Sequence, residues 1–327
     1  MGLLRSARVL LRSRHLFRNW LSLGIRYWLM RRGLLRKGDL VVKCGGGEFP
    51  LSPSHYSMIV SAHYEGLFHD FKCLGDGFLL DGFFVPVGWV YAVPALGCVR
   101  GLGARFDGDL LVFGYGNALV RLPPDVIPFI YDILCENFLG GAYDDVDVRG
   151  KVVVDVGAGV GDTAVMFALR GADMVIALEP YPNLYDTARR VVELNGVSHR
   201  VKLLNAAVGS FDGFVRACGD ALDYRLFRPC NHGVDVRVYT LGTLVSEFNL
   251  RGAVLKMDCE GCEYEALRNT DENTLEAFNQ VIIEYHNGPE PIIKRLEEAG
   301  FKTELKPIRS AIVPIEKQGY VIGRRVN

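Results

Sequence analysis

The sequence predicts an α/β fold for the C-terminal half of the chain, in which helices cover both faces of a doubly wound, mostly parallel sheet. First, short runs rich in Val and Ile alternate with segments of helical periodicity from Lys151 onward. Second, the run Val152–Val156 is apolar apart from Asp155, as in strands buried on both faces of a parallel sheet. Third, a glycine-rich turn follows this run directly.

The elements of this α/β domain are expected to alternate over residues 151–327. Strands are predicted at Val152–Val156, Met174–Leu178, Val201–Leu204, Val236–Tyr239, Ala253–Met257 and Val281–Tyr285. Helices are predicted at Asp162–Arg170, Leu184–Leu194, Leu241–Phe248, Glu263–Asn269 and Ile292–Ala299. Phe301–Leu305 and Tyr320–Ile322 are expected to close the sheet as its antiparallel edge pair.

Residues 1–38 are predicted to be a basic helical segment. Residues 1–40 hold ten Lys and Arg and a single acid, Asp39, although the formal net charge of the chain is −1. Apolar side chains recur at helical spacing from Phe17 to Leu29, which predicts an amphipathic helix. Two readings stay open: the helix packs on its own protein with solvated arginines, or it lies on an anionic membrane surface. Arginine interrupts the segment too often for a transmembrane span.

Residues 39–125 are expected to form a small β-rich accessory region. Short apolar runs alternate there with Gly, Pro and Asp, which mark turns. The runs are Leu40–Lys43, Phe78–Leu80, Phe83–Val87, Leu110–Phe113 and Ala118–Leu122. Residues 126–150 are interpreted as a helix over Val126–Phe138 and a linker into the α/β domain.

The composition indicates a globular protein without a nucleic-acid partner. Hydrophobic residues make up 49% of the chain, and the positive and negative charges nearly cancel. The eight cysteines are irregularly spaced and no secretory signal of the usual form is present, so reduced thiols and a cytoplasmic location are expected. In the second reading of the basic helix, the protein also has a peripheral contact with the inner membrane face. Scarce glutamine suggests a thermophile, in which disulfides would be allowed.

The glycine turn predicts a ligand that carries a nucleoside. Its residues are Gly157, Ala158, Gly159 and Gly161. Glycines let the backbone approach a ligand closely, and the helix that begins at Asp162 favours negative charge at its N-terminus. The spacing G-x-G-x-G differs from the G-x-G-x-x-G of dinucleotide sites, whose third glycine would fall at Asp162. With Asp155 just before the turn, the pattern favours S-adenosylmethionine over NAD.

Residues at two further strand ends fit the same ligand. Glu179, followed by Pro180, ends the second strand, where a carboxylate can accept hydrogen bonds from both ribose hydroxyls. Asn205 ends the third strand and can bond the adenine edge, and the small Ala206 leaves room for a flat ring. Each could be an ordinary strand end, but the preceding glycine turn favours the nucleoside interpretation.

Acidic residues and a histidine at the next two strand ends predict proton transfer. They are Asp258, Glu260 and Glu263 after Ala253–Met257, and Glu284 and His286 at the end of Val281–Tyr285. Like charges held this close raise the pKa of at least one carboxyl, and histidine titrates near neutrality. A solvated acidic helix start is the alternative for the first group, and a structural histidine for the second.

Metal binding is left open at this edge of the sheet. A divalent cation could be held by Asp258, Glu260 and a later carboxylate. Cys259 and Cys262 form a single C-x-x-C, which without a second pair is a weak zinc signal. No metal ligand is assigned on this basis.

Taken together, these stretches resemble the FkbM-type family of class I S-adenosylmethionine-dependent methyltransferases. The matching segments are 153–162 (VVDVGAGVGD), 177–180 (ALEP), 205–209 (NAAVG), 256–263 (KMDCEGCE) and 283–286 (IEYH). The resemblance covers residues from about 143 to the C-terminus and implies a Rossmann-like sheet of seven strands. It also implies methyl transfer, usually to a hydroxyl of a sugar, glycolipid or secondary metabolite.

The resemblance implies a role for each part of the site. Asp155 and the glycine turn would hold the methionine end of the cofactor, and Glu179 would hold its ribose. Asp258 or His286 would accept the hydroxyl proton. Glu260 and Glu284 would orient these groups or bind a cation.

Two other function classes stay open from the sequence alone. One is an NAD-dependent oxidoreductase, against which the missing glycine at position 162 argues. The other is a non-catalytic protein that keeps the cofactor fold and is tethered to a membrane surface by residues 1–38. Cofactor binding without methyl transfer would distinguish the second from an enzyme.

Overall fold

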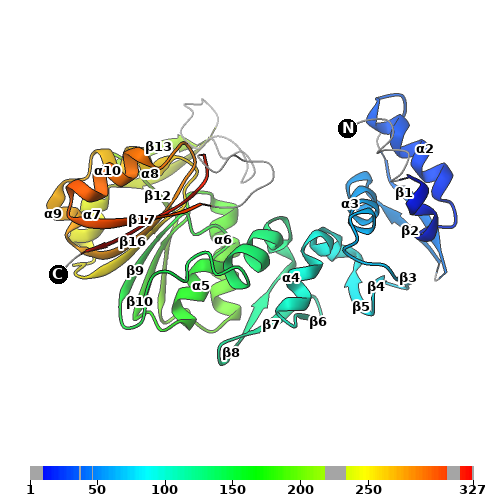
Figure 1. Ribbon diagram of the computed structural model, residues 1–327, viewed down its shortest axis with the longest axis horizontal. Coiled ribbons are helices and arrows are strands. Elements are labelled where there is room, and N and C mark those ends of the chain that lie inside the picture. The colour runs from blue at the N-terminus through cyan, green and yellow to red at the C-terminus, as the bar shows by residue number, and fades with distance from the viewer. Residues whose placement is uncertain (1–9, 37, 46, 218–232, 308–316, 326–327) are drawn as a thin grey trace. The chain divides into compact units, whose positions relative to one another are not determined.

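The computed structural model describes residues 10–36, 38–45, 47–217, 233–307 and 317–325 (Figure 1). Contacts divide the chain into two units. The N-terminal unit comprises residues 1–114 and 122–140, and the α/β unit comprises residues 115–121 and 141–327. The basic helix, most of the β-rich region and residues 126–140 therefore belong to one compact unit.

The N-terminal unit is built from short helices and small antiparallel sheets. Its helical elements are η1 (Ser13–His15), α2 (Trp20–Arg31), α3 (Pro53–Tyr64), η2 (Val87–Ala95), α4 (Leu96–Gly101), η3 (Pro124–Phe129) and η4 (Asp132–Phe138). Its strands are β1 (Leu40–Cys44), β2 (Gly47–Leu51), β3 (Phe71–Leu74), β4 (Gly77–Leu80), β5 (Phe83–Pro86), β6 (Arg105–Asp107) and β7 (Leu110–Tyr115). Strand β1 pairs with β2, β4 lies between β3 and β5, and β6 pairs with β7.

In this unit one expected helix needs correction, and one helix was not predicted. The single helix expected over Val126–Phe138 is two short elements, the 3-10 helix η3 and the π-helix η4. Pro128 lies inside η3, and a proline lacks the N–H that a continuous α-helix needs. Helix α3 was not expected, although Ser52 accepts a hydrogen bond from the His55 N–H at 3.2 Å and caps it.

Disulfides replace the reduced thiols expected from the sequence. Cys44 pairs with Cys73 and Cys98 with Cys135, with Cα–Cα distances of 5.9 and 5.3 Å. Every cysteine that the structure describes is disulfide-bonded. The expectation was wrong because these partners, 29 and 37 residues apart, are brought together only by the tertiary fold.

The α/β unit contains the predicted doubly wound sheet. Its strands are β9 (Val152–Val156), β10 (Met174–Leu178), β11 (Val201–Leu204), β15 (Ala253–Met257), β16 (Phe278–Tyr285), β17 (Phe301–Pro307) and β18 (Gly319–Arg325). They lie in the order β11-β10-β9-β15-β16-β18-β17. Strand β18 runs opposite to the other six: it pairs antiparallel with β16 and β17 and lies one strand in from the edge.

Helices cover both faces of this sheet, as expected. They are α5 (Asp162–Leu169), α6 (Pro182–Leu194), α7 (Leu241–Glu247), α8 (Cys262–Arg268), α9 (Glu272–Leu275) and α10 (Glu290–Glu298). Helices α5 and α6 pack together on one face, and α8 and α10 pack together on the other (Figure 1). No helix among the described residues is both long and apolar enough to cross a membrane.

A second, smaller sheet contains one strand that we expected in the main sheet. Strand β14 (Val234–Tyr239) lies between β12 (Ala206–Val208) and β13 (Gly213–Ala217). In β14 Val236 and Val238 are buried while their neighbours are more exposed. That alternation is typical of a sheet with one solvated face. The sequence therefore predicted the strand correctly, but we placed it in the wrong sheet.

Strand β8 is Ala118–Leu122, and its residues 118–121 belong to the α/β unit. The Arg121 N–H donates to the Asn195 side-chain oxygen at 2.8 Å, and the Asn195 amide donates to the Arg121 carbonyl at 2.9 Å.

The strand order brings the predicted site residues to one edge. Strand β9 lies between β10 and β15, so the chain leaves it in one direction and returns on its other side. Ligands bind α/β sheets at such a switch point, outside the carboxyl ends of the strands. Met257 is level with Val156 and Ile283 in neighbouring strands, so the residues after each converge.

Candidate active site

The glycine turn connects β9 to α5 and packs closely on both sides. A Cβ at Gly157 would overlap the Asp258 carbonyl oxygen, and one at Gly161 would lie 2.9 Å from Ala188 Cα in α6. Both glycines also have positive φ. A Cβ at Gly159, by contrast, would meet no atom within 4 Å. Two of the glycines are therefore required for packing, and the third faces open space beside the turn.

Asp155 lies beneath this turn and supports it. Its carboxylate accepts a hydrogen bond from the Thr163 hydroxyl at 2.7 Å and faces Lys256 Nζ at 3.0 Å. All three side chains are buried. Lys256 also donates to the Gly157 carbonyl at 2.7 Å, so the ion pair fixes the path of the turn from within the sheet. Asp162, the first residue of α5, is buried beside it.

Glu179 connects the turn to the end of β10. One carboxylate oxygen accepts from the Gly159 N–H and the other from the Tyr181 N–H, both at 2.9 Å. Burial raises the pKa of Glu179 to about 7, although these two hydrogen bonds lower it. Each oxygen keeps a second lone pair with which it can accept a hydroxyl hydrogen bond.

Asn205 marks the point where the chain leaves β11 for β12. Its amide donates to the carbonyls of Glu179 and Pro180 at 2.9 and 3.1 Å. The amide therefore joins two of the predicted nucleoside-binding segments. Ala206, like Ala158 in the glycine turn, is buried.

The acidic loop after β15 holds Asp258, Glu260 and Glu263 in different environments. Glu263 is buried at the start of α8, where one carboxylate oxygen accepts from the Gly261 N–H at 2.9 Å. Glu260 has a φ of 57°, in the left-handed region that non-glycine residues rarely adopt. A disulfide between Cys259 and Cys262, with Cα atoms 5.5 Å apart, closes this turn.

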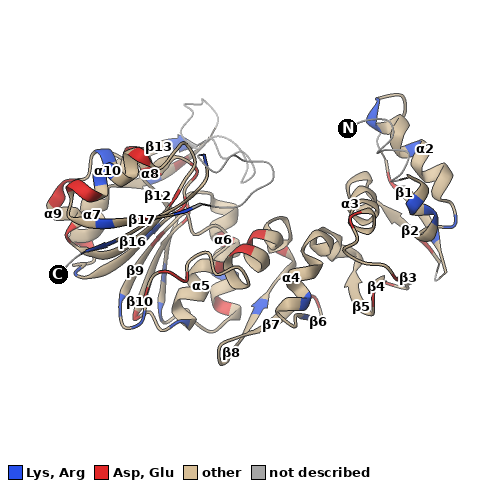
Figure 2. Ribbon diagram, in the orientation of Figure 1, with Lys and Arg blue, Asp and Glu red and all other residues tan. Residues whose placement is uncertain are grey.

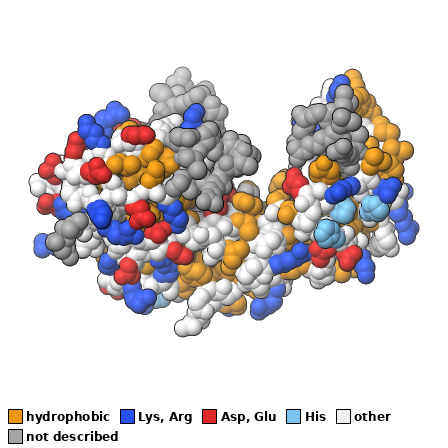
Figure 3. All heavy atoms as spheres, in the orientation of Figure 1, with side chains coloured by type: hydrophobic (Ala, Val, Ile, Leu, Met, Phe, Trp, Pro, Cys, Tyr) orange, Lys and Arg blue, Asp and Glu red, His pale blue; other side chains and the backbone are white. Residues whose placement is uncertain are grey.

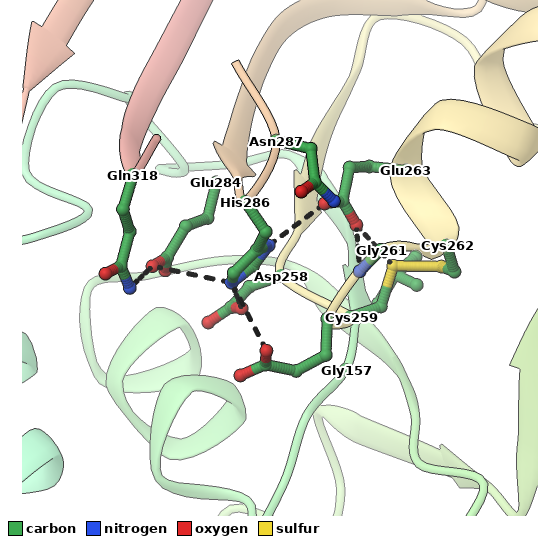
Figure 4. Close-up of polar contacts among 12 residues, drawn as sticks. Gly157, Asp258, Cys259, Gly261, Cys262, Glu263, Glu284, His286, Asn287 and Gln318 are labelled. Atoms are coloured by element: carbon green, nitrogen blue, oxygen red, sulfur yellow. Dashed lines mark hydrogen bonds and ion pairs between the residues drawn. A yellow bond between two sulfur atoms is a disulfide. The ribbon is translucent and has the colours of Figure 1, made fainter. Parts of the chain in front are cut away.

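His286 lies at the centre of the acidic residues (Figure 4). Its Nδ1 is 3.0 Å from Glu263 Oε1, within hydrogen-bond distance. On the other side of the ring, Nε2 lies 3.9 Å from Asp258, 3.6 Å from Glu260 and 3.8 Å from Glu284. The buried Glu263 thus fixes the tautomer with the proton on Nδ1, and Nε2 faces the remaining carboxylates.

Burial and the charges of these carboxylates change the pKa values of His286 and Glu284. Burial lowers the pKa of His286, but the hydrogen bond with Glu263 and the charges of Asp258 and Glu260 outweigh it and raise the pKa to about 9. Burial and the charge of Asp258 raise the pKa of Glu284 to about 8. Because the two groups interact, their titrations belong to the cluster rather than to either residue alone.

Three residues that the sequence did not single out hold this cluster in place. The Tyr143 hydroxyl donates to Asp258 at 3.1 Å, and burial raises the pKa of this tyrosine well above its ordinary value. Gln318 donates to Glu284 at 2.9 Å. The Tyr264 hydroxyl accepts the His286 N–H at 3.1 Å. Tyr143 and Gln318 lie outside the motifs, so only the fold could reveal them, whereas Tyr264 directly follows the acidic motif.

Two groups in the described residues have ligand atoms close enough to share a metal ion. One is Asp258, Glu284 and His286, and the other is Cys259, Cys262 and Glu263, each with its atoms within 4.8 Å of one another. The cysteines of the second group are joined by a disulfide and have no thiolate to offer. In the first group, the carboxylate oxygens of Asp258 and Glu284 and a ring nitrogen of His286 can still bind a metal ion.

The residues present fit S-adenosylmethionine. The open space beside Gly159 and the helix start after it suit the carboxylate of its methionine part. The buried Glu179 suits the ribose hydroxyls.

Comparison with known proteins supplies the family. The model of the FkbM methyltransferase domain matches residues 155–321. Protein arginine N-methyltransferase 7 from Mus musculus is 29% identical over 125 residues, which cover 36% of this chain and 17% of that protein. The chain thus spans only a small part of that relative.

Two solved structures give a broader alignment. The methyltransferase FkbM from Methylobacillus flagellatus aligns with 72% of this chain and 60% of its own, with 13% identity and a TM-score of 0.38. TYW2 from M. jannaschii in complex with AdoMet aligns with 68% of this chain and 89% of its own, with 16% identity and a TM-score of 0.37.

The family match begins at Asp155, which supports the glycine turn, and ends at Val321 in β18. It therefore includes the turn, Glu179, the acidic loop and His286 in one continuous segment of about half the chain. The chain belongs to the FkbM family of S-adenosylmethionine-dependent methyltransferases.

Proposed function

We propose that this methyltransferase acts on a hydroxyl oxygen of a sugar, glycolipid or secondary metabolite, with His286 as the proton acceptor. The observation that carries the proposal is the placement of His286 between the buried Glu263 on one side and the carboxylates of Asp258, Glu260 and Glu284 on the other. A hydroxyl must lose its proton as its oxygen is methylated, and a histidine held in one tautomer is suited to accept it.

Each of these residues has its own role in the proposed reaction. Glu263 holds Nδ1–H, so the lone pair of neutral His286 lies on Nε2. Asp258 and Glu284 stand on the Nε2 side, where they stabilise the imidazolium that forms. When bound, S-adenosylmethionine supplies an electrophilic methyl group on its sulfonium. Glu179 and the glycine turn would hold this cofactor, whose methyl group is transferred to the acceptor.

Two measurements on the purified chain test these roles separately. Calorimetry with S-adenosylhomocysteine should show binding that Glu179→Ala abolishes and His286→Asn preserves. Transfer of a labelled methyl group to a glycan extract should be lost in His286→Asn. His199, an exposed histidine between α6 and β11, supplies the matched control, and His199→Asn should keep full transfer. Undiminished transfer in His286→Asn would overturn the assignment of the base.

A second candidate acceptor is a guanidinium nitrogen. Asp258, Glu260 and Glu284 form a negative cluster that suits a cationic acceptor, and the relative from Mus musculus is named an arginine N-methyltransferase. Arginine-containing peptides should be tested beside the glycan extract. Methylation of the peptide alone would replace the hydroxyl assignment.

A divalent cation at Asp258, Glu284 and His286 is the alternative to proton transfer by the histidine. The chelator EDTA distinguishes the two. Transfer that survives EDTA supports His286 as the base, whereas loss of transfer that Mg²⁺ restores assigns these residues to the metal.

A further inference from the structure

Among the described residues, one apolar face of α2 stays exposed. Helix α2 packs on its own protein through Leu23 and Met30, which are buried. Leu21, Ile25 and Trp28 are 52%, 49% and 45% exposed. Because they are spaced i, i+4 and i+7, they form one ridge along the helix, on the side away from Leu23 and Met30. The sequence had left open whether these three residues pack on the protein itself or face a membrane surface.

Basic side chains surround this apolar ridge. Arg32, the C-cap residue of α2, follows the ridge at its C-terminal end, and its guanidinium lies 4.6 Å from the centre of the Trp28 ring. Arg18 is exposed two residues before the start of the helix. Further exposed basic residues nearby are Arg14, Arg26, Arg31 and Arg36. Residues 1–38 contain no Asp or Glu. Figure 2 shows Lys and Arg along and around α2, and Figure 3 shows hydrophobic and basic side chains adjoining at that end of the chain.

We propose that α2 lies flat on an anionic lipid bilayer, with Leu21, Ile25 and Trp28 inserted at the level of the headgroups. Aliphatic side chains gain from entering the acyl boundary, and an indole ring is favoured at the interface. Arginines at the ends of the ridge can extend along it and bind lipid phosphates. With 12 residues, α2 is too short to span a bilayer, so the contact is peripheral.

The combination of apolar and basic side chains on the ridge favours a lipid surface over other anionic partners. A nucleic acid would be bound by the arginines but would leave three large apolar side chains without a partner. A bilayer accommodates both kinds of side chain at once, because its phosphates lie directly above its acyl chains. This proposal does not depend on the acceptor of the methyl group.

Flotation of the full chain with vesicles tests the proposal. Vesicles of phosphatidylcholine with phosphatidylglycerol should carry the protein upward, and vesicles of phosphatidylcholine alone should carry little of it. The variant Leu21→Ser/Ile25→Ser/Trp28→Ser should reduce the bound fraction about tenfold or more. Raising the salt from about 0.1 M to about 1 M shortens the Debye length from about 10 to about 3 Å and should weaken binding of the unaltered chain.

Matched controls keep the result interpretable. Met174, Phe214 and Leu305 are comparably exposed in the α/β unit, and their triple serine variant should bind vesicles like the unaltered chain. S-adenosylhomocysteine binding should be the same in all variants, which shows that they fold. The proposal is overturned if the unaltered chain stays below the anionic vesicles or if the ridge variant floats equally well. It is also overturned if the ridge variant changes only the oligomeric state in solution.

Discussion

Glu263→Gln tests how His286 is tuned, because the substitution keeps the shape of a buried side chain and removes its charge. Glu263 Oε1 lies 3.0 Å from His286 Nδ1, and Oε2 accepts the Gly261 N–H. A glutamine can still accept one of these hydrogen bonds, but its NH₂ group would then face the other donor. The imidazolium therefore loses a charge-assisted hydrogen bond.

The expected change in the pKa of His286 follows from the free energy of that hydrogen bond. A hydrogen bond to a charged group is worth about 1.5–3 kcal/mol, and one pKa unit corresponds to about 1.4 kcal/mol. The pKa of His286 should therefore fall from about 9 by about 1–2 units in Glu263→Gln. NMR titration of the labelled histidines measures it, and His286→Asn identifies the resonance. A pKa that stays near 9 in the variant would refute the role given to Glu263.

The same substitution gives a stability prediction with a definite sign. The pKa of His286 is raised above its ordinary value of 6.5, so its protonation stabilises the folded state below pH 6.5. This contribution is lost as the pH rises through about 9. The unfolding free energies of the original chain and Glu263→Gln should therefore differ most at about pH 6 and converge toward about pH 10. A constant difference across this range would contradict the coupling.

The remaining predictions concern the support of the site and the fold. Lys256→Met should destabilise the fold by about 3–5 kcal/mol in denaturant unfolding, because it leaves Asp155 buried without its cation; a loss below about 1 kcal/mol would exclude this pairing as a support. Gly161→Ala should prevent stable folding, since its Cβ would meet Ala188, and a normal melting temperature would contradict the packing. The pKa of Glu179 is raised above its ordinary 4.5 to about 7, so stability should fall as the pH rises between these values, and Glu179→Gln should remove that fall in pH-dependent melting. Reducing the two disulfides of the N-terminal unit should cost about 3–4 kcal/mol each by loop entropy, which calorimetry with and without reductant would reveal.

Local patterns were sufficient to predict the core of the α/β unit. The valines around Asp155 and the three following glycines specify a buried strand and a tight turn without help from distant residues. A parallel sheet then places the ends of β9, β10, β15 and β16 at one edge. The meeting of the glycine turn, Glu179, the acidic loop and His286 follows from that topology.

Features that depend on tertiary contacts were missed. Tyr143 reaches Asp258 from a loop 115 residues earlier, and Gln318 reaches Glu284 across 34 residues. The two disulfides of the N-terminal unit are missed for the same reason. Helix α2 shows a different limit. It has apolar residues on two faces, and periodicity alone could not tell which face the protein covers.

The pH dependence of methyl transfer tests the proposed chemistry most directly. With a glycan extract as acceptor, kcat/KM should rise with pH through the titration of the cluster, between about 8 and 9, and then level off. His286→Asn should remove this rise along with most of the activity, and His199→Asn should retain it. A rate that is independent of pH from about 6 to about 10, or an unchanged profile in His286→Asn, would contradict proton transfer to His286.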